Sequence, residues 1–261
     1  MANKISEGDN YTWGFFYRDQ NGKFIRPWYT DLTSQLKLFF KLPPGTPLQP
    51  PKVIPLSTEE KLNLHSKYLI NKHNTIVLCP HSTTTQKLSE TFWENFVARL
   101  DNILPPDKHR ICVYTNIKDS SEYVIKGTLP ICATVKEMFY VAENSLCVIG
   151  MRSGLIEFLS LSKATTLIFG QSAFEDDLKS VIFDTRIMFP FSNLAHTIYF
   201  DTGILDFIKN FASGIIKSKS RLELLKRVMN DDRAKFFHTH EEAIEFVTEF
   251  VKKKYLEEES N

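Results

Sequence analysis

The sequence predicts an α/β protein built on a doubly wound, mostly parallel sheet. Short apolar runs such as Thr75 to Cys79 recur along the chain, and amphipathic stretches of about 10–15 residues separate them. A strand buried on both faces reads as a continuous apolar run, and strands that alternate with helices form parallel sheets. The clearest example runs from Leu146 to Gly170, where strand, turn, helix and strand patterns follow one another. Together these features favour a Rossmann-like fold.

The first 56 residues differ from the rest of the chain. They are rich in aromatic side chains, hold one short helical pattern from Leu32 to Phe40, and end in a linker, LPPGTPLQPPKVIP, with six of the 12 prolines. An aromatic surface of this kind marks an interface. We therefore expect residues 1–56 to be an arm and linker, either the end of a missing N-terminal domain or a docking site for a protein partner or a second copy. Residues 57–261 would form the main domain.

The main domain is expected to begin with a helix that Ser57 and Glu60 open as a capping box and that continues to about Ile70. The strand at Thr75 to Cys79 comes next. An amphipathic helix from about Glu90 to Leu104 then leads to a strand at Arg110 to Tyr114. This order is the repeating unit of a parallel sheet.

The second half of the domain repeats the pattern. Thr134 and Glu137 form another capping box, for a helix to about Glu143, and a strand at Leu146 to Ile149 follows. Gly150, Ser153 and Gly154 are expected to make a sharp turn into a helix ending near Ser162, before a strand at Thr165 to Phe169. The remaining expected elements are a strand at Ile198 to Phe200 and helices at Leu205 to Ile216, at Arg221 to Met229 and, after Thr239 and Glu242, to about Tyr255.

Composition excludes several classes of function. Lys and Arg total 32 and Asp and Glu total 31, which gives no support to nucleic-acid binding. The N-terminus lacks an apolar signal core, and no apolar run approaches the ~20 residues that span a bilayer. We expect a cytoplasmic protein, with peripheral binding to the inner membrane left open. The four cysteines form no CxxC pair and are expected to be reduced core residues. His238 and His240 lack a third ligand in register, so no metal site is expected.

Polar residues follow two of the predicted strands. Arg152 and Glu157 come after the strand at Leu146 to Ile149, where the carboxyl ends of parallel strands bind ligands. Arginine offers a bidentate fork for phosphate, and a carboxylate one turn into the helix accepts hydrogen bonds from ribose hydroxyls. Ser153 and Gly154 would add main-chain N–H donors. The alternative is an ordinary strand–helix–strand unit whose turn holds an arginine.

The second polar segment follows the strand at Thr75 to Cys79. It contains His81, Ser82, Thr83 and Lys87, whose hydroxyls, main-chain N–H groups and ammonium suit a pyrophosphate. The alternative is a solvated turn.

Two blocks together resemble heptosyltransferase-type glycosyltransferases, which have the two-domain GT-B fold and build lipopolysaccharide cores. The segment from Ile76 to Lys87, with Trp93 after it, is similar to the family's "strand, Pro-Gly-x-Ser, Lys, Trp" segment. The residues from Cys132 to Gly170 are similar to its later block, with a "(T/S)-x-x-E" helix, an "I-G-x-D-S-G-x-x-H" turn and a "P-x-x-x-L-F-G" strand. The resemblance covers residues 75–170 and implies the C-terminal, nucleotide-sugar-binding half of such an enzyme.

The chain departs from this family at informative positions. Arg152 stands in place of the family's Asp, Glu157 in place of its His, and His81 in place of a Gly. The "RSGL" turn also resembles that of capsular-polysaccharide glycosyltransferases. The Glu-x7-Glu pair of many retaining enzymes is missing, because Thr165 stands eight residues after Glu157. The resemblance thus favours an inverting, metal-independent transferase.

The resulting expectation is a glycosyltransferase that uses a nucleotide-diphosphate sugar as donor substrate, without a cofactor, to make bacterial surface polysaccharide or lipopolysaccharide. Its acceptor would be a glycan or a lipid-linked glycan. The catalytic base is not identified, because in inverting enzymes of this type it usually comes from the N-terminal domain. Two alternatives stay open: a non-catalytic subunit that docks on a partner glycosyltransferase, and a sugar-nucleotide epimerase on the same scaffold.

Overall fold

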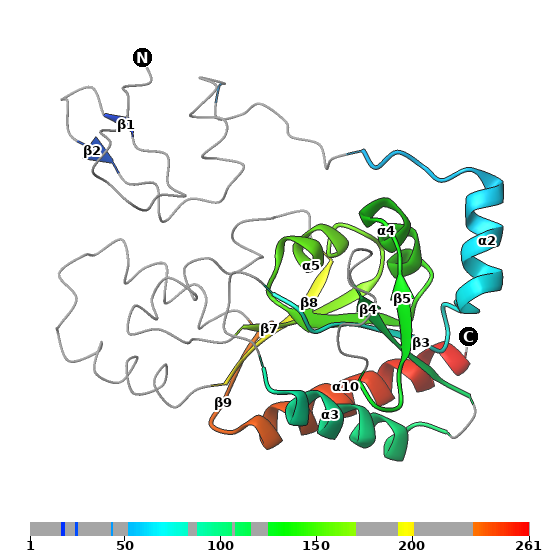
Figure 1. Ribbon diagram of the computed structural model, residues 1–261. Helices are drawn as coiled ribbons and strands as arrows, with labels where there is room; N and C mark the ends of the chain where they lie inside the picture. The colour runs from blue at the N-terminus through cyan, green and yellow to red at the C-terminus, as the bar shows by residue number, and fades with distance from the viewer. Residues whose placement is uncertain are drawn as a thin grey trace, which may run out of the picture.

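The computed structural model describes residues 17–18, 24–25, 43, 52–82, 88–105, 108–115, 125–170, 193–200 and 232–260. Seven strands in these ranges form one sheet in the order β5-β4-β3-β6-β7-β8-β9, and every neighbouring pair is parallel (Figure 1). The strands are β3 (Thr75–Cys79), β4 (Arg110–Thr115), β5 (Leu129–Cys132), β6 (Cys147–Met151), β7 (Thr165–Gly170), β8 (Leu194–Phe200) and β9 (Ala234–Phe237). The predicted α/β, Rossmann-like sheet is confirmed.

Helices cover both faces of this sheet (Figure 1). On one face, α3 (Glu90–Ile103) lies beside α10 (His240–Glu259). On the other face lie α4 (Val135–Glu143) and α5 (Gly154–Leu159), and α2 (Thr58–Tyr68) packs against α4. A separate short ladder pairs β1 (Tyr17–Arg18) with β2 (Phe24–Ile25) in antiparallel register.

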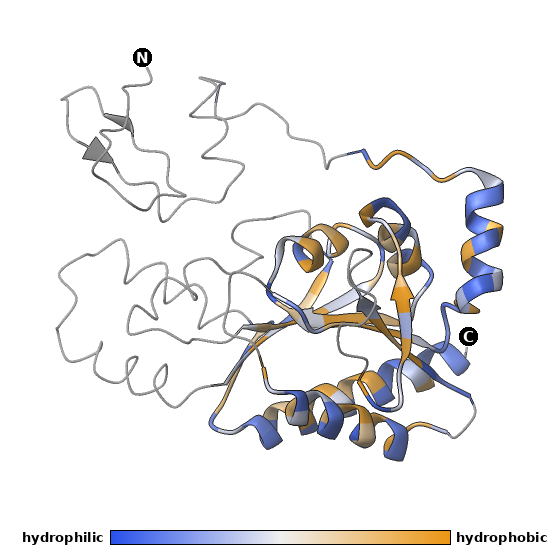
Figure 2. Ribbon diagram, viewed as in Figure 1, coloured by the Kyte–Doolittle hydropathy of each residue, from blue (hydrophilic) through white to orange (hydrophobic). Residues whose placement is uncertain are grey.

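The two hydrophobic cores follow from the alternation of side chains along the strands. In β3, Ile76 and Leu78 join the core under α3 and α10, whereas Val77 and Cys79 join the core under α4 and α5. All five residues of β3 are buried, as in a strand covered on both faces. Figure 2 shows the same division: the sheet and the helix faces toward it are hydrophobic, and the outer helix faces are hydrophilic.

The three predicted capping boxes are present at the starts of α2, α4 and α10. At α10, Thr239 accepts from the main-chain N–H of Glu242, and the Glu242 carboxylate accepts from the main-chain N–H of Thr239. The main-chain donors of Thr239 and His238 hold the pKa of Glu242 below its usual value. These boxes fix the helix starts that the sequence predicted.

Other boundaries differ from the predictions. Helix α2 ends at Tyr68, because Leu69 adopts a left-handed conformation (φ 50°) and its N–H bonds back to His65. Helix α5 ends at Leu159, short of Ser162. Strand β6 continues to Met151, so the prediction that Gly150 belongs to the turn was wrong. The expected helices at residues 32–40, 205–216 and 221–229 lie outside the described residues.

Strands β5 and β9 were not predicted, and β5 forms an edge of the sheet. The hydroxyl of Tyr68 on α2 donates to the main-chain carbonyl of Cys132 (2.7 Å) and accepts from its N–H (3.2 Å). The main-chain N–H and C=O of Cys132 therefore point away from β4. The main chain of Pro130, two residues earlier, points the same way. A proline at an edge lacks a donor that would otherwise face outward, so Tyr68 and Pro130 both close this edge to further pairing.

The end of the linker, from residue 52, is part of the described fold. Leu56 is 7% exposed and belongs to the core under α4 and α5, and Val53 packs against the same core. The predicted division between residues 56 and 57 remains a prediction, but the segment from residue 53 onward contacts the main domain. None of the helices in the described ranges is long and apolar enough to cross a membrane.

Candidate functional site

The chain reverses its direction of travel across the sheet between β3 and β6. From β3 it moves outward through β4 to β5, and it then returns to the other side of β3 to form β6, β7, β8 and β9. In open parallel sheets, ligands bind in the crevice beyond the carboxyl ends of the two strands where this reversal occurs. The residues that follow β3 and β6 are the two polar segments predicted from the sequence.

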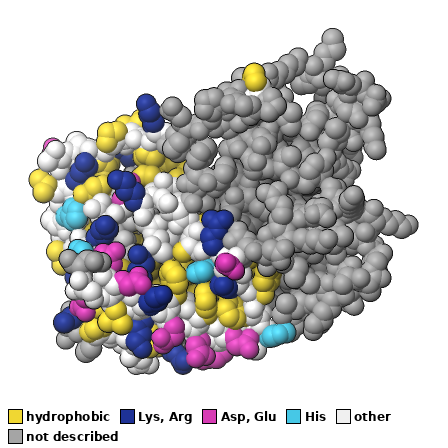
Figure 3. Space-filling model, turned by 180° about the vertical axis from the view of Figure 1, so that it is seen from behind, with side chains coloured by type: hydrophobic (Ala, Val, Ile, Leu, Met, Phe, Trp, Pro, Cys, Tyr) yellow, Lys and Arg dark blue, Asp and Glu magenta, His cyan; other side chains and the backbone are white. Residues whose placement is uncertain are grey.

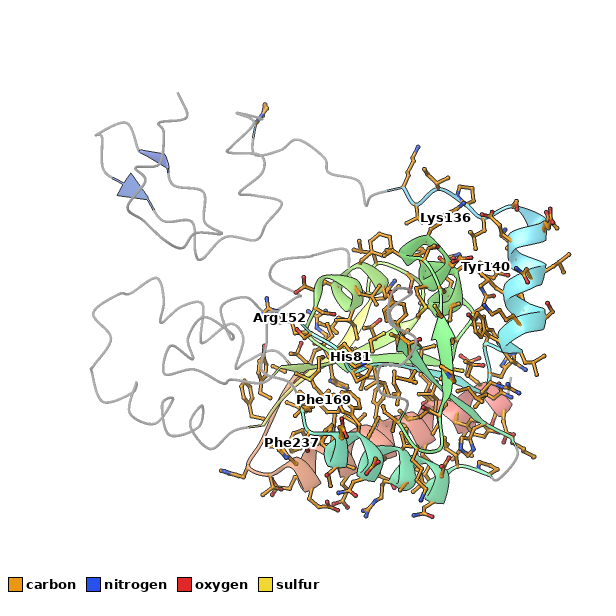
Figure 4. The ribbon with its side chains drawn as sticks, viewed as in Figure 1. His81, Lys136, Tyr140, Arg152, Phe169 and Phe237 are labelled. Atoms are coloured by element: carbon orange, nitrogen blue, oxygen red, sulfur yellow. The ribbon has the colours of Figure 1, made fainter. Side chains whose placement is uncertain are left out.

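The segment after β3 begins with Pro80, His81 and Ser82. The side chain of His81 is half-buried, and Ser82 is 4% exposed. The predicted site residues Thr83 and Lys87 lie outside the described residues, so their part in the site stays a prediction. Figure 4 shows His81 and Arg152 at the same end of the sheet.

The segment after β6 is held by main-chain bonds on both sides. The Arg152 N–H donates to the carbonyl of Phe169 at the end of β7 (3.1 Å). The Arg152 carbonyl accepts from the hydroxyl of Ser82 (2.7 Å). The main chain of Arg152 is therefore fixed between the ends of β3 and β7, at the point where the strand order reverses.

The turn into α5 has the predicted cap. Ser153 is the N-cap and its hydroxyl accepts from the main-chain N–H of Ile156 (3.4 Å). Gly154 is the first helical residue, and a Cβ atom built on it would meet none of the described residues within 4 Å. The described part of the chain therefore leaves space beside Gly154, and its contact with a ligand remains a prediction.

Gly150 brings the two strands of the site close together. A Cβ atom on Gly150 would lie 2.3 Å from the carbonyl oxygen of Cys79 and 2.8 Å from Cδ1 of Ile156. Any larger residue would push β6 away from β3 or α5 away from the sheet. The glycine is therefore needed for close packing, not for a turn.

The side chains of Arg152 and Glu157 form an ion pair. Arg152 Nε lies 3.2 Å from Glu157 Oε1, and the two side chains are 16% and 20% exposed. The sequence placed both residues at the site but did not predict that they contact each other. On a helix, side chains three or four residues apart contact each other, but these two are five residues apart. Arg152 also precedes the helix that carries Glu157, so no helical spacing predicts the contact.

An aromatic cluster packs behind this end of the sheet. Phe169, the partner of Arg152, makes edge-to-face contacts with Phe92, Trp93 and Phe96 of α3, at ring distances of 5.3, 5.7 and 5.9 Å. Trp93, one of the motif residues, is 1% exposed and therefore forms part of the core. These contacts fix the end of β7 to which Arg152 is bonded.

The thiol at the end of β3 is not a nucleophile. Burial raises the pKa of Cys79, the last residue of β3, to about 12. The thiolate, which is the reactive form, is therefore negligible at neutral pH. The four cysteines are free, as the prediction of reduced core residues requires. Three of them are buried, and Cys132 is half-buried.

Charge and metal-ligand patterns are ordinary elsewhere in the described part of the chain. Charged groups of both signs lie on the described surface seen in Figure 3. No group of three or more His, Cys, Asp or Glu side chains among the described residues is arranged to hold a metal ion. Independence from a metal remains a prediction.

The fold is that of an α/β protein with a Rossmann-like sheet, and polar residues lie where the strand order reverses. Among solved structures, the chain is similar to a glycosyl transferase family 9 protein from Veillonella parvula, with a TM-score of 0.50 and 10% identity over 85% of this chain and 59% of that one. It is also similar to the ADP-heptose lps heptosyltransferase II of E. coli, with a TM-score of 0.48 and 11% identity over 84% of this chain and 57% of that one.

This chain spans less than two thirds of the length of either structure. At such low identity the likeness concerns the fold alone. No protein-family model matches the sequence, and no curated protein matches it.

Proposed function

We propose that this chain binds a nucleotide-diphosphate sugar and forms the donor-binding part of a glycosyltransferase that makes bacterial surface polysaccharide or lipopolysaccharide. The observation that carries the proposal is the bond between Ser82 and Arg152, which joins the two predicted donor-binding segments where the strand order reverses. The similarity in fold to a family 9 glycosyl transferase supports it.

Each site residue has a proposed role. Arg152 and Lys87 neutralise the diphosphate, on which charge develops as it leaves. His81, Ser82 and Thr83 supply polar contacts from the loop after β3, and Ser153 and Gly154 supply main-chain N–H groups. Glu157 accepts from ribose. Because Oε1 of Glu157 contacts Arg152, a ribose hydroxyl would bind most readily at Oε2.

Transfer of the sugar also needs an acceptor and a base. The proposed acceptor is a glycan or a lipid-linked glycan, and the proposed chemistry is inverting and independent of metal. The carboxylate beside Arg152 belongs to Glu157, and it is engaged in an ion pair with that arginine. We propose that the base comes from a domain or partner that docks through residues 1–56.

Calorimetric titration of the full chain tests the proposal. The titrants are nucleotide sugars that carry UDP, GDP, CMP or ADP, together with the corresponding free nucleotides. Saturable binding of one of these donors is expected. Arg110→Ala is a matched control, because this arginine begins β4 at the opposite end of the strands and its loss should leave affinity unchanged. If none of the donors binds, the proposal is wrong.

Donor binding without transfer is the second candidate, and the pairing of Glu157 favours it because that carboxylate is already engaged. A chain of this kind would act as a non-catalytic subunit of a partner glycosyltransferase. The two candidates differ in the release of free nucleotide from a bound donor. Release that depends on a glycan acceptor supports the transferase, whereas tight binding without release supports the subunit.

A further inference from the structure

Helix α5 carries Glu157 but is too short to hold its own position. It has six residues, and isolated helices shorter than about 12–15 residues are marginal in water. Ser153 caps its start, whereas the carbonyls at its end need donors from outside the helix. The carbonyl of Ser160, the C-cap, accepts from the main-chain N–H of Asn193 (2.6 Å). The carbonyl of Ser162 accepts from Nδ2 of the same asparagine.

Ser160 connects Asn193 to Glu157. Its carbonyl accepts from Asn193, and its hydroxyl donates to the main-chain carbonyl of Glu157 (2.7 Å). The N–H of Glu157 donates to the carbonyl of Ser153 (3.0 Å), so the main chain of Glu157 is bonded on both sides. Ser160 is fully buried, and buried polar groups are costly to leave without their bonds. The position of Glu157 therefore depends on the bonds that Asn193 makes at the end of α5.

Asn193 itself is fixed to the sheet. It directly precedes β8, and its carbonyl accepts from the main-chain N–H of Thr166 on β7 (3.5 Å). The next residue, Leu194, pairs with Thr166 in the ladder between these strands. Asn193 is exposed, so replacing its side chain leaves no cavity in the core. This residue thus ties α5 to the sheet through polar bonds that a substitution can change selectively.

We propose that Asn193 is a positioning residue: it fixes the last turn of α5 against the sheet and, through Ser160, sets where the carboxylate of Glu157 meets the ribose of the donor. This inference rests on the proposed function, because it assumes that Glu157 accepts from ribose. It assigns the geometry of the ribose contact to a residue that does not touch the ligand.

The test substitution is Asn193→Asp, which keeps the shape of the side chain but replaces the Nδ2 donor with a carboxylate oxygen. That oxygen repels the carbonyl of Ser162 and loosens the end of α5. Asn144→Asp is the matched control, because Nδ2 of Asn144 donates to the carbonyl of Tyr140 (2.8 Å) at the C-cap of α4. Both variants make the same chemical change at the end of a helix, and the two helices contact each other.

The probes are ADP, GDP, UDP and CMP, each paired with its 2′-deoxy form and titrated into the full chain by calorimetry. The wild type should prefer the ribo form of the nucleotide that it binds. Asn193→Asp should reduce that preference by about three- to tenfold, the contribution of one hydrogen bond, and should leave the affinity for the deoxy form unchanged. Asn144→Asp should keep the wild-type preference. In a Glu157→Ala background, Asn193→Asp should have no further effect on the preference.

A merely structural role of Asn193 would lower stability and weaken both forms equally. The positioning role is therefore wrong if folded Asn193→Asp keeps the wild-type preference, if Asn144→Asp reduces it as much, or if the effect persists without Glu157. If the wild type binds a nucleotide without preferring its ribo form, the ribose contact fails and this inference with it, while donor binding stands. If none of the nucleotides binds, the proposed function itself fails. Circular dichroism confirms folding, and Asn193→Ala replaces the Asp variant if that one does not fold.

Discussion

The side-chain hydroxyl of Ser82 donates a 2.7 Å hydrogen bond to the main-chain carbonyl of Arg152. The two residues are 70 positions apart in the sequence, and the bond joins the turn after β3 to the turn after β6. Ser82 is 4% exposed, so water has little access to compensate for a lost bond. The position of Arg152 therefore depends on a residue in the turn that follows the neighbouring strand β3.

Replacing Ser82 with alanine should destabilise the fold and move Arg152. The carbonyl of Arg152 loses this donor at a part-buried position, and we expect the free energy of unfolding to fall by about 1–2 kcal/mol. Affinity for a nucleoside diphosphate should fall as well. Ser66→Ala is the matched control, because the hydroxyl of Ser66 bonds to a carbonyl on exposed α2 (3.0 Å). Urea unfolding and calorimetry measure both effects, and equal behaviour of the two variants would contradict the account.

The core strands were predictable because burial on both faces leaves a continuous apolar run in the sequence. Strands β3, β4, β6 and β7 carry that signal, and their bounds agree with the prediction to within two residues. Strand β5 was missed because its sequence, LPIC, contains a proline and half of it is exposed at the sheet edge. Strand β9 is four residues long and mostly half-buried, so it has no comparable signal.

The site was predictable in composition but only partly in geometry. Arg152, Ser82 and His81 could be placed at one crevice because they follow strands whose carboxyl ends share an edge. The bond between Ser82 and Arg152, and the ion pair with Glu157, depend on the distance between β3 and β6. That distance is set by Gly150. From the sequence alone, a glycine needed for close packing cannot be distinguished from a glycine needed for a turn.

Gly150→Ala should therefore be strongly destabilising, because its Cβ would lie 2.3 Å from a main-chain oxygen of β3. We expect a loss of about 1–3 kcal/mol or more, the usual cost of overpacking. Gly154→Ala is the matched control four residues away. The Cβ atom added there would meet none of the described residues within 4 Å, so the substitution should stabilise α5 by about 0.4–1 kcal/mol. Chemical denaturation distinguishes the two, and a tolerated alanine at position 150 would mean that β3 and β6 do not approach so closely.

The cysteines should differ sharply in reactivity. Burial raises the pKa of Cys79 and of Cys147 to about 12. At pH 8, four units below that value, their thiolate fraction is on the order of 10⁻⁴. Half-buried Cys132 is expected to react first with iodoacetamide in the native protein. The three buried thiols, those of Cys79, Cys112 and Cys147, should react only after unfolding. Peptide mass mapping identifies the cysteines that have been labelled. Early labelling of Cys147 would show that the central strands open readily.

The buried position of Leu56 predicts where the main domain must begin. A chain that starts at residue 57 loses Leu56, and burial of a leucine contributes about 1.5–3 kcal/mol. A chain that starts at residue 52 keeps both Leu56 and Val53 and should unfold at a higher temperature. Both shortened chains should associate less than the full chain in light scattering, because they lack the aromatic arm. Equal thermal stability of the two would show that Leu56 does not support the domain.

The central claim is that Arg152 binds the diphosphate of a nucleotide donor, and calorimetric titration of Arg152→Ala against the wild type tests it most directly. The variant should bind the preferred nucleoside diphosphate about 1.5–3 kcal/mol more weakly, the range for a charge-assisted hydrogen bond. Its thermal unfolding should change little, because the main-chain bonds of Arg152 to Phe169 and Ser82 remain when the side chain is removed. Unchanged affinity together with a sharp fall in thermal stability would contradict the claim and would make Arg152 a structural residue.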